Sequence, residues 1–202
     1  MKPSTPWLAG FRQLRIALFA AAIAGSLTLL PANLQSEIPL PPGGDFTLQS
    51  EQGRVSLSDL KGQVVVLYFG YTSCPSVCPV SLSMISSAFR GLTPEEQASV
   101  RIVFVSVDPE RDSPKIVGNY ARAFGKTAIG LTGSPEQIRE TAKRYGVYYR
   151  KANLDSAMGY SVDHSSVTYV INARGRLLRL LKHGTKPSEI QEAMRDAIRS
   201  KE

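Results

Sequence analysis

A continuous run at residues 63–69, apolar in all but its first position, leads into the only two cysteines of the chain, Cys74 and Cys78. Valine, leucine, tyrosine and phenylalanine without alternating polar residues are typical of a strand that is buried on both faces. Each cysteine directly precedes a proline, which disfavours helical backbone at the cysteine. We therefore predict a strand, then a loop that holds Cys74, then a helix with Pro79 at its first position. The positive end of the helix dipole should lower the pKa of Cys78 there.

Two thiols so close together can form a reversible disulfide or bind a soft metal such as copper(I) through two thiolates. The plainer alternative is a pair of inert buried thiols or a structural disulfide, since cysteine is often buried. A disulfide between Cys74 and Cys78 would close a very short loop and add little stability through chain entropy. We therefore favour a redox pair or a metal site.

The N-terminus has the pattern of an export signal. Lys2, Arg12 and Arg15 precede an uncharged stretch at residues 16–30, and no acidic residue occurs before Glu37. We predict an uncleaved signal anchor over residues 1–32, with a cleaved signal peptide as the alternative. The rest of the chain would face the periplasm from the bacterial cytoplasmic membrane, where disulfides can form.

Behind this segment, proline and glycine at residues 33–45 predict a tether, and residues 46–202 predict one globular domain. The formal net charge is +7, and three of these positive charges lie before residue 16, which leaves +4 for the remainder. No run of five like charges occurs, and no basic stripe is interleaved with aromatic residues. We therefore expect no binding to nucleic acid.

Strand and helix patterns alternate along the domain, which predicts an α/β sandwich of the thioredoxin type. Residues 46–48 and 55–57 predict an N-terminal hairpin. Serine or threonine followed by proline predicts helix starts at Thr93, Ser113 and Ser134. The remaining expected elements are strands at 100–107, 167–171 and 177–181 and a C-terminal helix that includes 190–198.

His164 occupies an expected loop at residues 161–166, just before the strand that begins at Val167. In a thioredoxin-like sheet this loop faces the start of the first helix, so His164 would complete a set of two thiolates and one imidazole, suited to copper(I) or copper(II). Asp163 could orient the imidazole. The alternative is an isolated polar histidine in a loop. We expect His183 to be a solvated loop residue, and Met84 and Met158 to fill the core or a loop rather than bind copper.

Three motifs together resemble the Sco/SenC family of copper proteins: residues 69–79, 106–112 and 162–165. The resemblance runs from about Leu40 to the C-terminal helix. It implies a thioredoxin fold behind one N-terminal helix, copper bound by Cys74, Cys78 and His164, and delivery to the dinuclear copper site of cytochrome c oxidase subunit II. The family usually has aspartate where this chain has Ser76, which removes a charge but no ligand. The resemblance suggests that residues 108–112 pack near the site or face a partner, whereas the plain alternative is a solvated turn.

Two classes of function remain open. A metallochaperone would bind copper and hand it over without turnover of its own, which is the interpretation we favour. A thiol-disulfide oxidoreductase, or a thiol peroxidase, would use Cys74 and Cys78 as its redox pair and reduce the cysteines of the oxidase copper site. The three-residue spacer between the cysteines and the absence of proline between residues 135 and 187 differ from the thioredoxin pattern. Expected partners are subunit II, the membrane, and a thiol reductant or another copper donor.

Overall fold

The computed structural model describes residues 39–154 and 159–200. The predicted signal anchor and the first part of the predicted tether lie outside these residues, as does Met158. Within the described part, no helix is both long enough and apolar enough to span a membrane.

A mixed five-stranded sheet forms the centre of the fold, with the order β5-β4-β3-β8-β9. The central strand β3 (Val64–Gly70) is buried at every position, as its apolar sequence predicted. It runs parallel to β4 (Val100–Ser106), which runs parallel to β5 (Ile129–Leu131). On its other side β3 is antiparallel to β8 (Val167–Ile171), which forms a hairpin with β9 (Leu177–Lys182). This mixed sheet is the central layer that the predicted α/β fold requires.

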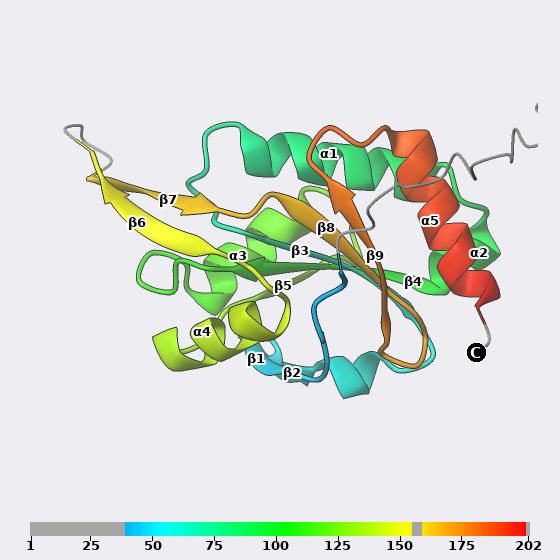
Figure 1. Cartoon of the computed structure of the whole chain (residues 1–202), viewed down its shortest axis with the longest axis horizontal. Helices are drawn as coiled ribbons and strands as arrows, with labels where there is room; N and C mark the ends of the chain where they lie inside the picture. The colour runs from blue at the N-terminus through cyan, green and yellow to red at the C-terminus, as the bar shows by residue number, and fades with distance from the viewer. Residues whose placement is uncertain (1–38, 155–158, 201–202) are drawn as a thin grey trace, which may run out of the picture. The chain divides into compact units, whose positions relative to one another are not determined.

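Helices cover both faces of the sheet (Figure 1). The helices α1 (Val77–Arg90) and α5 (Pro187–Arg199) lie together on one face. The helix α3 (Pro114–Arg122) shares that face, because its Tyr120 packs on Phe104 of β4. The opposite face carries α4 (Pro135–Arg144), where the adjoining Tyr145 packs on Phe69 of β3. The short α2 (Pro94–Ala98) connects α1 to β4.

Local sequence signals place the starts of α2, α3 and α4 correctly. The side chains of Thr93, Ser113 and Ser134 each accept a hydrogen bond from a backbone N–H three residues later. Each is followed by proline, whose missing N–H costs nothing in a first helical turn. The predicted N-terminal hairpin is also present, as β1 (Thr47–Ser50) and β2 (Gly53–Ser56), and it is followed by the 3-10 turn η1 (Leu57–Leu60).

The packed fold begins before residue 46. The amide of Gly43 donates to the carbonyl of Arg144 at 3.0 Å, and the hydroxyl of Tyr145 donates to the carbonyl of Gly44 at 2.8 Å. The last residues of the expected tether are therefore tied to the end of α4 and form part of the domain.

A second antiparallel pair, β6 (Tyr149–Asn153) and β7 (Tyr160–His164), extends away from the central sheet (Figure 1). This pair was not predicted, and His164 is the last residue of β7 rather than part of a loop. The strands carry polar and charged side chains on exposed positions, so their apolar periodicity is weak. Only Ser165 and Ser166 separate β7 from β8 of the central sheet.

Candidate metal centre

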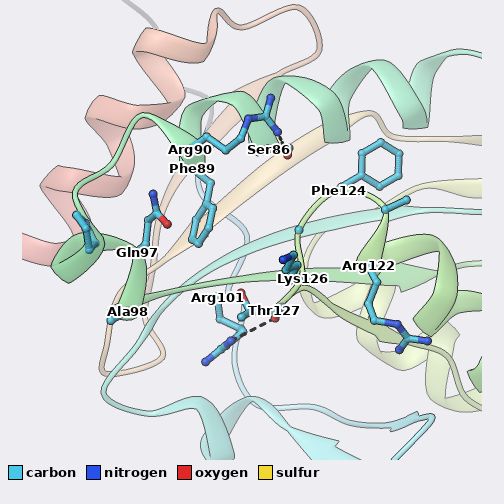
Figure 2. Close-up of a pocket in the computed structure, with 13 residues that line it drawn as sticks. Ser86, Phe89, Arg90, Gln97, Ala98, Arg101, Arg122, Phe124, Lys126 and Thr127 are labelled. Atoms are coloured by element: carbon cyan, nitrogen blue, oxygen red, sulfur yellow. Dashed lines mark hydrogen bonds between the residues drawn. The ribbon is translucent and has the colours of Figure 1, made fainter.

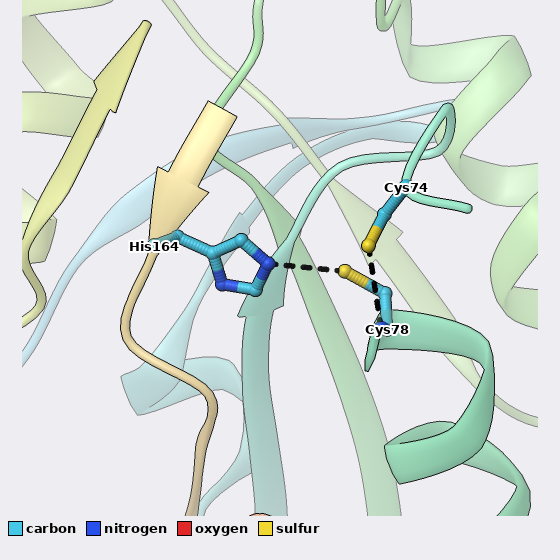
Figure 3. Close-up of side chains that lie close together, drawn as sticks. All are labelled: Cys74, Cys78 and His164. Atoms are coloured by element: carbon cyan, nitrogen blue, oxygen red, sulfur yellow. Dashed lines mark hydrogen bonds between the residues drawn. The ribbon is translucent and has the colours of Figure 1, made fainter. Parts of the chain in front are cut away.

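Cys74, Cys78 and His164 meet at one point, although 86 residues separate Cys78 from the histidine in sequence. Cys74 lies in the loop after β3, Cys78 is the second residue of α1, and His164 ends β7. One ligand atom from each residue lies within 4.8 Å of the other two (Figure 3). This is the group of three metal-ligating side chains found among the described residues. The predicted convergence of the two cysteines with the histidine is therefore present.

The helix α1 begins at Val77, two residues earlier than predicted. Pro79 is accommodated because the first four N–H groups of a helix have no partner inside the helix, so its missing N–H is not needed. The free N–H of Cys78 instead donates to the sulfur of Cys74 at 3.4 Å. Ser76 is the residue before the helix, and its exposed side chain makes no capping hydrogen bond. The helix N-terminus is thus directed at the sulfur of Cys74.

The two thiols differ in acidity, in the opposite sense to the sequence prediction. A hydrogen bond from the thiol of Cys78 holds the pKa of Cys74 well below its usual range, and the backbone N–H groups of Cys78 and Ser76 lower it further. The same bond from Cys78 to Cys74 raises the pKa of Cys78, and burial of its fully enclosed sulfur raises it further. The prediction that Cys78 has the lowered pKa is wrong, because its thiol donates to Cys74 and is buried. The helix N–H groups support the neighbouring, half-buried sulfur of Cys74 instead.

His164 presents its Nε2 atom to the thiols. Its Nδ1 atom lies 3.0 Å from the carbonyl oxygen of Ser165, which can only accept, so Nδ1 carries the proton of the neutral ring. The unprotonated Nε2 then lies 3.2 Å from the sulfur of Cys78. The rings of Tyr68 and Tyr71 meet the imidazole edge to face, with centroids at 6.3 and 5.8 Å. The ring is therefore held in the tautomer and direction that a metal ligand requires.

Asp163 does not orient the imidazole as expected. Adjacent residues of a strand point to opposite faces, and the exposed carboxylate of Asp163 forms an ion pair with Arg150 at 3.6 Å. The partner of Nδ1 is the carbonyl of Ser165. No sequence pattern marks this partner, since any residue could supply a backbone carbonyl.

The other residues considered from the sequence lie outside this group. His183 is exposed, and its Nδ1 atom lies 2.9 Å from the hydroxyl of Ser81 on α1. Met84 is partly buried and packs against the hydrophobic core, as predicted. A hollow of about 620 Å³ lies at the far end of α1, between Phe89, Arg101 and Lys126 (Figure 2). It contains no cysteine or histidine and is separate from the metal centre.

The loop that follows β4 packs against the site. The sequence had left open whether residues 108–112 pack there, face a partner or form a solvated turn. Asp108 and Asp112 are buried, at 0% and 1% exposure, rather than solvated. Asp112 accepts hydrogen bonds from the amide and hydroxyl of Thr72, two residues before Cys74. Thr72 was not predicted, because nothing in the local sequence distinguishes it from an ordinary loop threonine.

Close packing around residue 70 leaves no space for a side chain, so this position requires glycine. A Cβ atom at this position would lie 2.6 Å from the sulfur of Cys78 and 3.0 Å from Cε2 of Phe104. We predict that Gly70→Ala displaces the Cys78 sulfur, weakens metal binding and destabilises the fold by about 1–3 kcal/mol, the usual cost of overpacking. Metal titration and urea unfolding measure the two effects.

Gly125→Ala is the matched control. Its added Cβ would lie 3.7 Å from Ile102 and 3.8 Å from Ala128, which are ordinary contacts. Metal affinity in Gly70→Ala equal to that of Gly125→Ala would show that the Cys78 sulfur has more room than the structure indicates.

Comparison with known proteins places these features in a family. The SCO1/SenC family model matches residues 36–199. A SCO2-like protein of Rickettsia felis is 37% identical over 155 residues, which are 76% of this chain and 75% of that protein.

Solved structures agree with the sequence comparisons. The structure of Arabidopsis thaliana ScoI with copper bound matches with a TM-score of 0.73 and 36% identity, covering 78% of this chain and 98% of that one. A structure of BsSco, a member of the Sco family of cytochrome c oxidase assembly proteins in which a disulfide switch is identified, matches with a TM-score of 0.58 and 29% identity. It covers 79% of this chain and 96% of that one.

Proposed function

The chain belongs to the SCO1/SenC family, and from that premise we propose that it is a copper metallochaperone. It binds copper through Cys74, Cys78 and His164 and delivers the ion to the dinuclear copper site of cytochrome c oxidase subunit II. The observation that carries the proposal is the convergence of two sulfur atoms and one imidazole nitrogen within 4.8 Å. Thiolate ligands suit copper(I), and imidazole is also a suitable copper ligand. The match to a structure of ScoI with copper bound supports the choice of metal.

The geometry suits a transferable ion. Cys74 and His164 are partly exposed, whereas Cys78 is buried. Copper would meet the Cys74 thiolate first, and binding at Cys78 would release its proton. His164 needs no reorientation, because Nε2 already faces the sulfurs. A partner's ligands can approach from the side of Cys74 and His164 while Cys78 still holds the metal.

A transfer experiment tests the delivery step. The copper-loaded protein is mixed with the soluble copper-binding fragment of subunit II, its cysteines reduced, in the presence of a copper chelator in excess. We expect copper to reach the fragment, as measured by metal analysis after the two proteins are separated, because direct ligand exchange avoids free copper. The same total copper, supplied as the copper–chelator complex without this protein, is the control. Transfer no faster than from the copper–chelator complex would contradict delivery.

A second candidate is a thiol-disulfide oxidoreductase, favoured by the unequal thiols. The Cys74 thiolate, whose pKa is lowered, would attack a partner disulfide and form a mixed disulfide. The Cys78 sulfur would then attack Cys74 and close an intramolecular disulfide, and its proton would pass to the departing partner thiolate. Two electrons move from the pair to the partner, so a thiol reductant must restore the pair. The disulfide switch identified in BsSco supports this alternative.

Both functions require an exported domain. We propose that residues 1–32 anchor the protein in the bacterial cytoplasmic membrane with the domain in the periplasm. The positive residues before the apolar stretch support this orientation. The periplasm permits both the thiol and the disulfide state of the pair.

A further inference from the structure

The strand that carries His164 is not part of the sheet that carries the cysteines. The cysteines follow β3, in the five-stranded sheet, whereas β7 pairs only with β6 among the described strands. Backbone hydrogen bonds therefore do not fix the distance from His164 to the sulfurs. The short connection to β8 restrains one end of β7 and leaves its direction to be set by other contacts.

Asp112 fixes the start of the loop that carries Cys74. One carboxylate oxygen accepts from the amide of Thr72 at 2.9 Å and from the hydroxyl of Ser106 at 2.5 Å, and the other accepts from the Thr72 hydroxyl at 2.5 Å. Ser106 is the last residue of β4. The start of the cysteine loop is thereby tied to the central sheet.

Asp108 and Arg111 lie in the same loop after β4, and they hold β7, the strand that carries His164. The buried carboxylate of Asp108 accepts from Nε of Arg111 at 2.5 Å and from the hydroxyl of Tyr160 at 2.8 Å. Nη1 of Arg111 donates to the carbonyl of Tyr160 at 2.9 Å. The guanidinium also covers the Tyr160 ring, 3.7 Å from its centroid. Tyr160 is the first residue of β7, so this end of the strand is clasped by its ring, hydroxyl and backbone together.

Arg111 also reaches the residues that surround the imidazole. Its guanidinium lies 5.6 Å from the ring centroid of Tyr71, which in turn meets the ring of His164 edge to face. Tyr71 directly follows β3 and precedes Thr72. Arg111 therefore lies between the cysteine loop and β7 and contacts both.

We propose that Asp108 and Arg111 are positioning residues. By holding Tyr160 against the loop after β4, they set the distance and direction from His164 to the two sulfurs. We call these contacts of Asp108 and Arg111 with Tyr160 the clasp. The proposal deepens the copper site and rests on it. A loosened clasp would let β7 swing about its connection to β8 and move Nε2 away from the thiols. Copper(II) depends on the imidazole and would be bound less tightly, whereas copper(I) is satisfied by the two thiolates.

Two conservative variants test the clasp. Arg111→Lys keeps the charge but loses the planar fork that donates to Asp108 and Tyr160 together. Tyr160→Phe keeps the ring and loses only the hydroxyl bond to Asp108. Arg122→Lys is the matched control, because Arg122 pairs with Glu51 on the surface at 2.7 Å. Copper(II) and copper(I) affinities are measured by chelator competition, amide hydrogen exchange is followed in the metal-free protein, and His164→Ala is run in parallel.

We expect Arg111→Lys to lower copper(II) affinity about 10- to 100-fold, the range for residues that orient a metal ligand, with a smaller loss in Tyr160→Phe. Copper(I) affinity should stay within about threefold, and amide exchange should quicken in β7 but not in α1. Unchanged copper(II) affinity would overturn the proposal, as would equal losses of both affinities with a lowered melting temperature. If His164→Ala leaves copper(II) binding intact, His164 is not a copper ligand and the proposed copper site is wrong. The rate of amide hydrogen exchange in β7 then still decides whether Asp108 and Arg111 hold the strand.

Discussion

Replacement of His164 by alanine is expected to lower copper(II) affinity more than about 100-fold, beyond the range seen when only a residue behind a ligand is lost. Copper(II) prefers nitrogen and oxygen ligands in a tetragonal arrangement, and His164 supplies the imidazole nitrogen that faces the site. Copper(I) affinity should fall less, because both thiolates remain. Charge-transfer absorption of copper(II) and competition for copper(I) measure the two effects.

The same variant separates the two candidate functions. Reduction of a model disulfide should remain largely intact, because the amide of Cys78 still supports the Cys74 sulfur. His183→Ala is the control, since it removes an exposed histidine whose described bond is to Ser81. Failed oxidase assembly with normal disulfide reduction would identify metal delivery as the main function. Normal assembly with copper(II) binding lost would contradict the three-ligand chaperone and favour the reductase.

Oxidation of Cys74 and Cys78 to a disulfide is expected to abolish copper binding at this site. Both sulfurs are free in the structure, and their atoms lie within 4.8 Å of each other. A disulfide requires about 2.05 Å between the sulfurs, a distance that side-chain rotation and a small loop movement can reach. The disulfide has no thiolate left to donate, so only His164 would remain as a ligand. Thiol titration and metal analysis on the same samples measure the two states.

Reduction should restore both free thiols and full copper binding. A variant with both cysteines changed to serine should bind no copper under either condition, which controls for oxidation elsewhere in the chain. Full copper loading of the disulfide form would show that the cysteines are not the ligands.

Features that depend on a few neighbouring residues were predictable from the sequence. Six of the seven buried positions of β3 lie in the apolar run at residues 63–69, a pattern typical of a strand that is covered on both faces. Helix starts at Thr93, Ser113 and Ser134 follow from side-chain caps and proline, which act within one turn. The convergence of the two cysteines and His164 was predicted from the way a thioredoxin-like sheet places the segment before Val167, and from the resemblance to the Sco/SenC family.

The start of α1 and the acidity of the two thiols could not be predicted in this way. Proline next to a cysteine disfavours helix, but the first turn tolerates it, so local preference alone did not decide between Val77 and Pro79. The lowered pKa belongs to Cys74 because its sulfur accepts from the thiol of Cys78 and also from the Cys78 N–H, while Cys78 is enclosed by the core. Burial and hydrogen-bond direction are properties of the packed chain.

The sequence by itself determined four of the five strands of the central sheet, three helix starts and the chemical identity of the three candidate ligands, because these depend on residue type and short-range pattern. The short edge strand β5 was not predicted. The tertiary structure alone decided that His164 ends a strand, that Ser165 rather than Asp163 fixes its tautomer, and that Asp108 and Arg111 clasp Tyr160. Tyr160 lies 52 residues from Asp108 and 49 from Arg111 in the chain. Contacts over such separations form only when the whole domain packs, and no local pattern encodes their geometry.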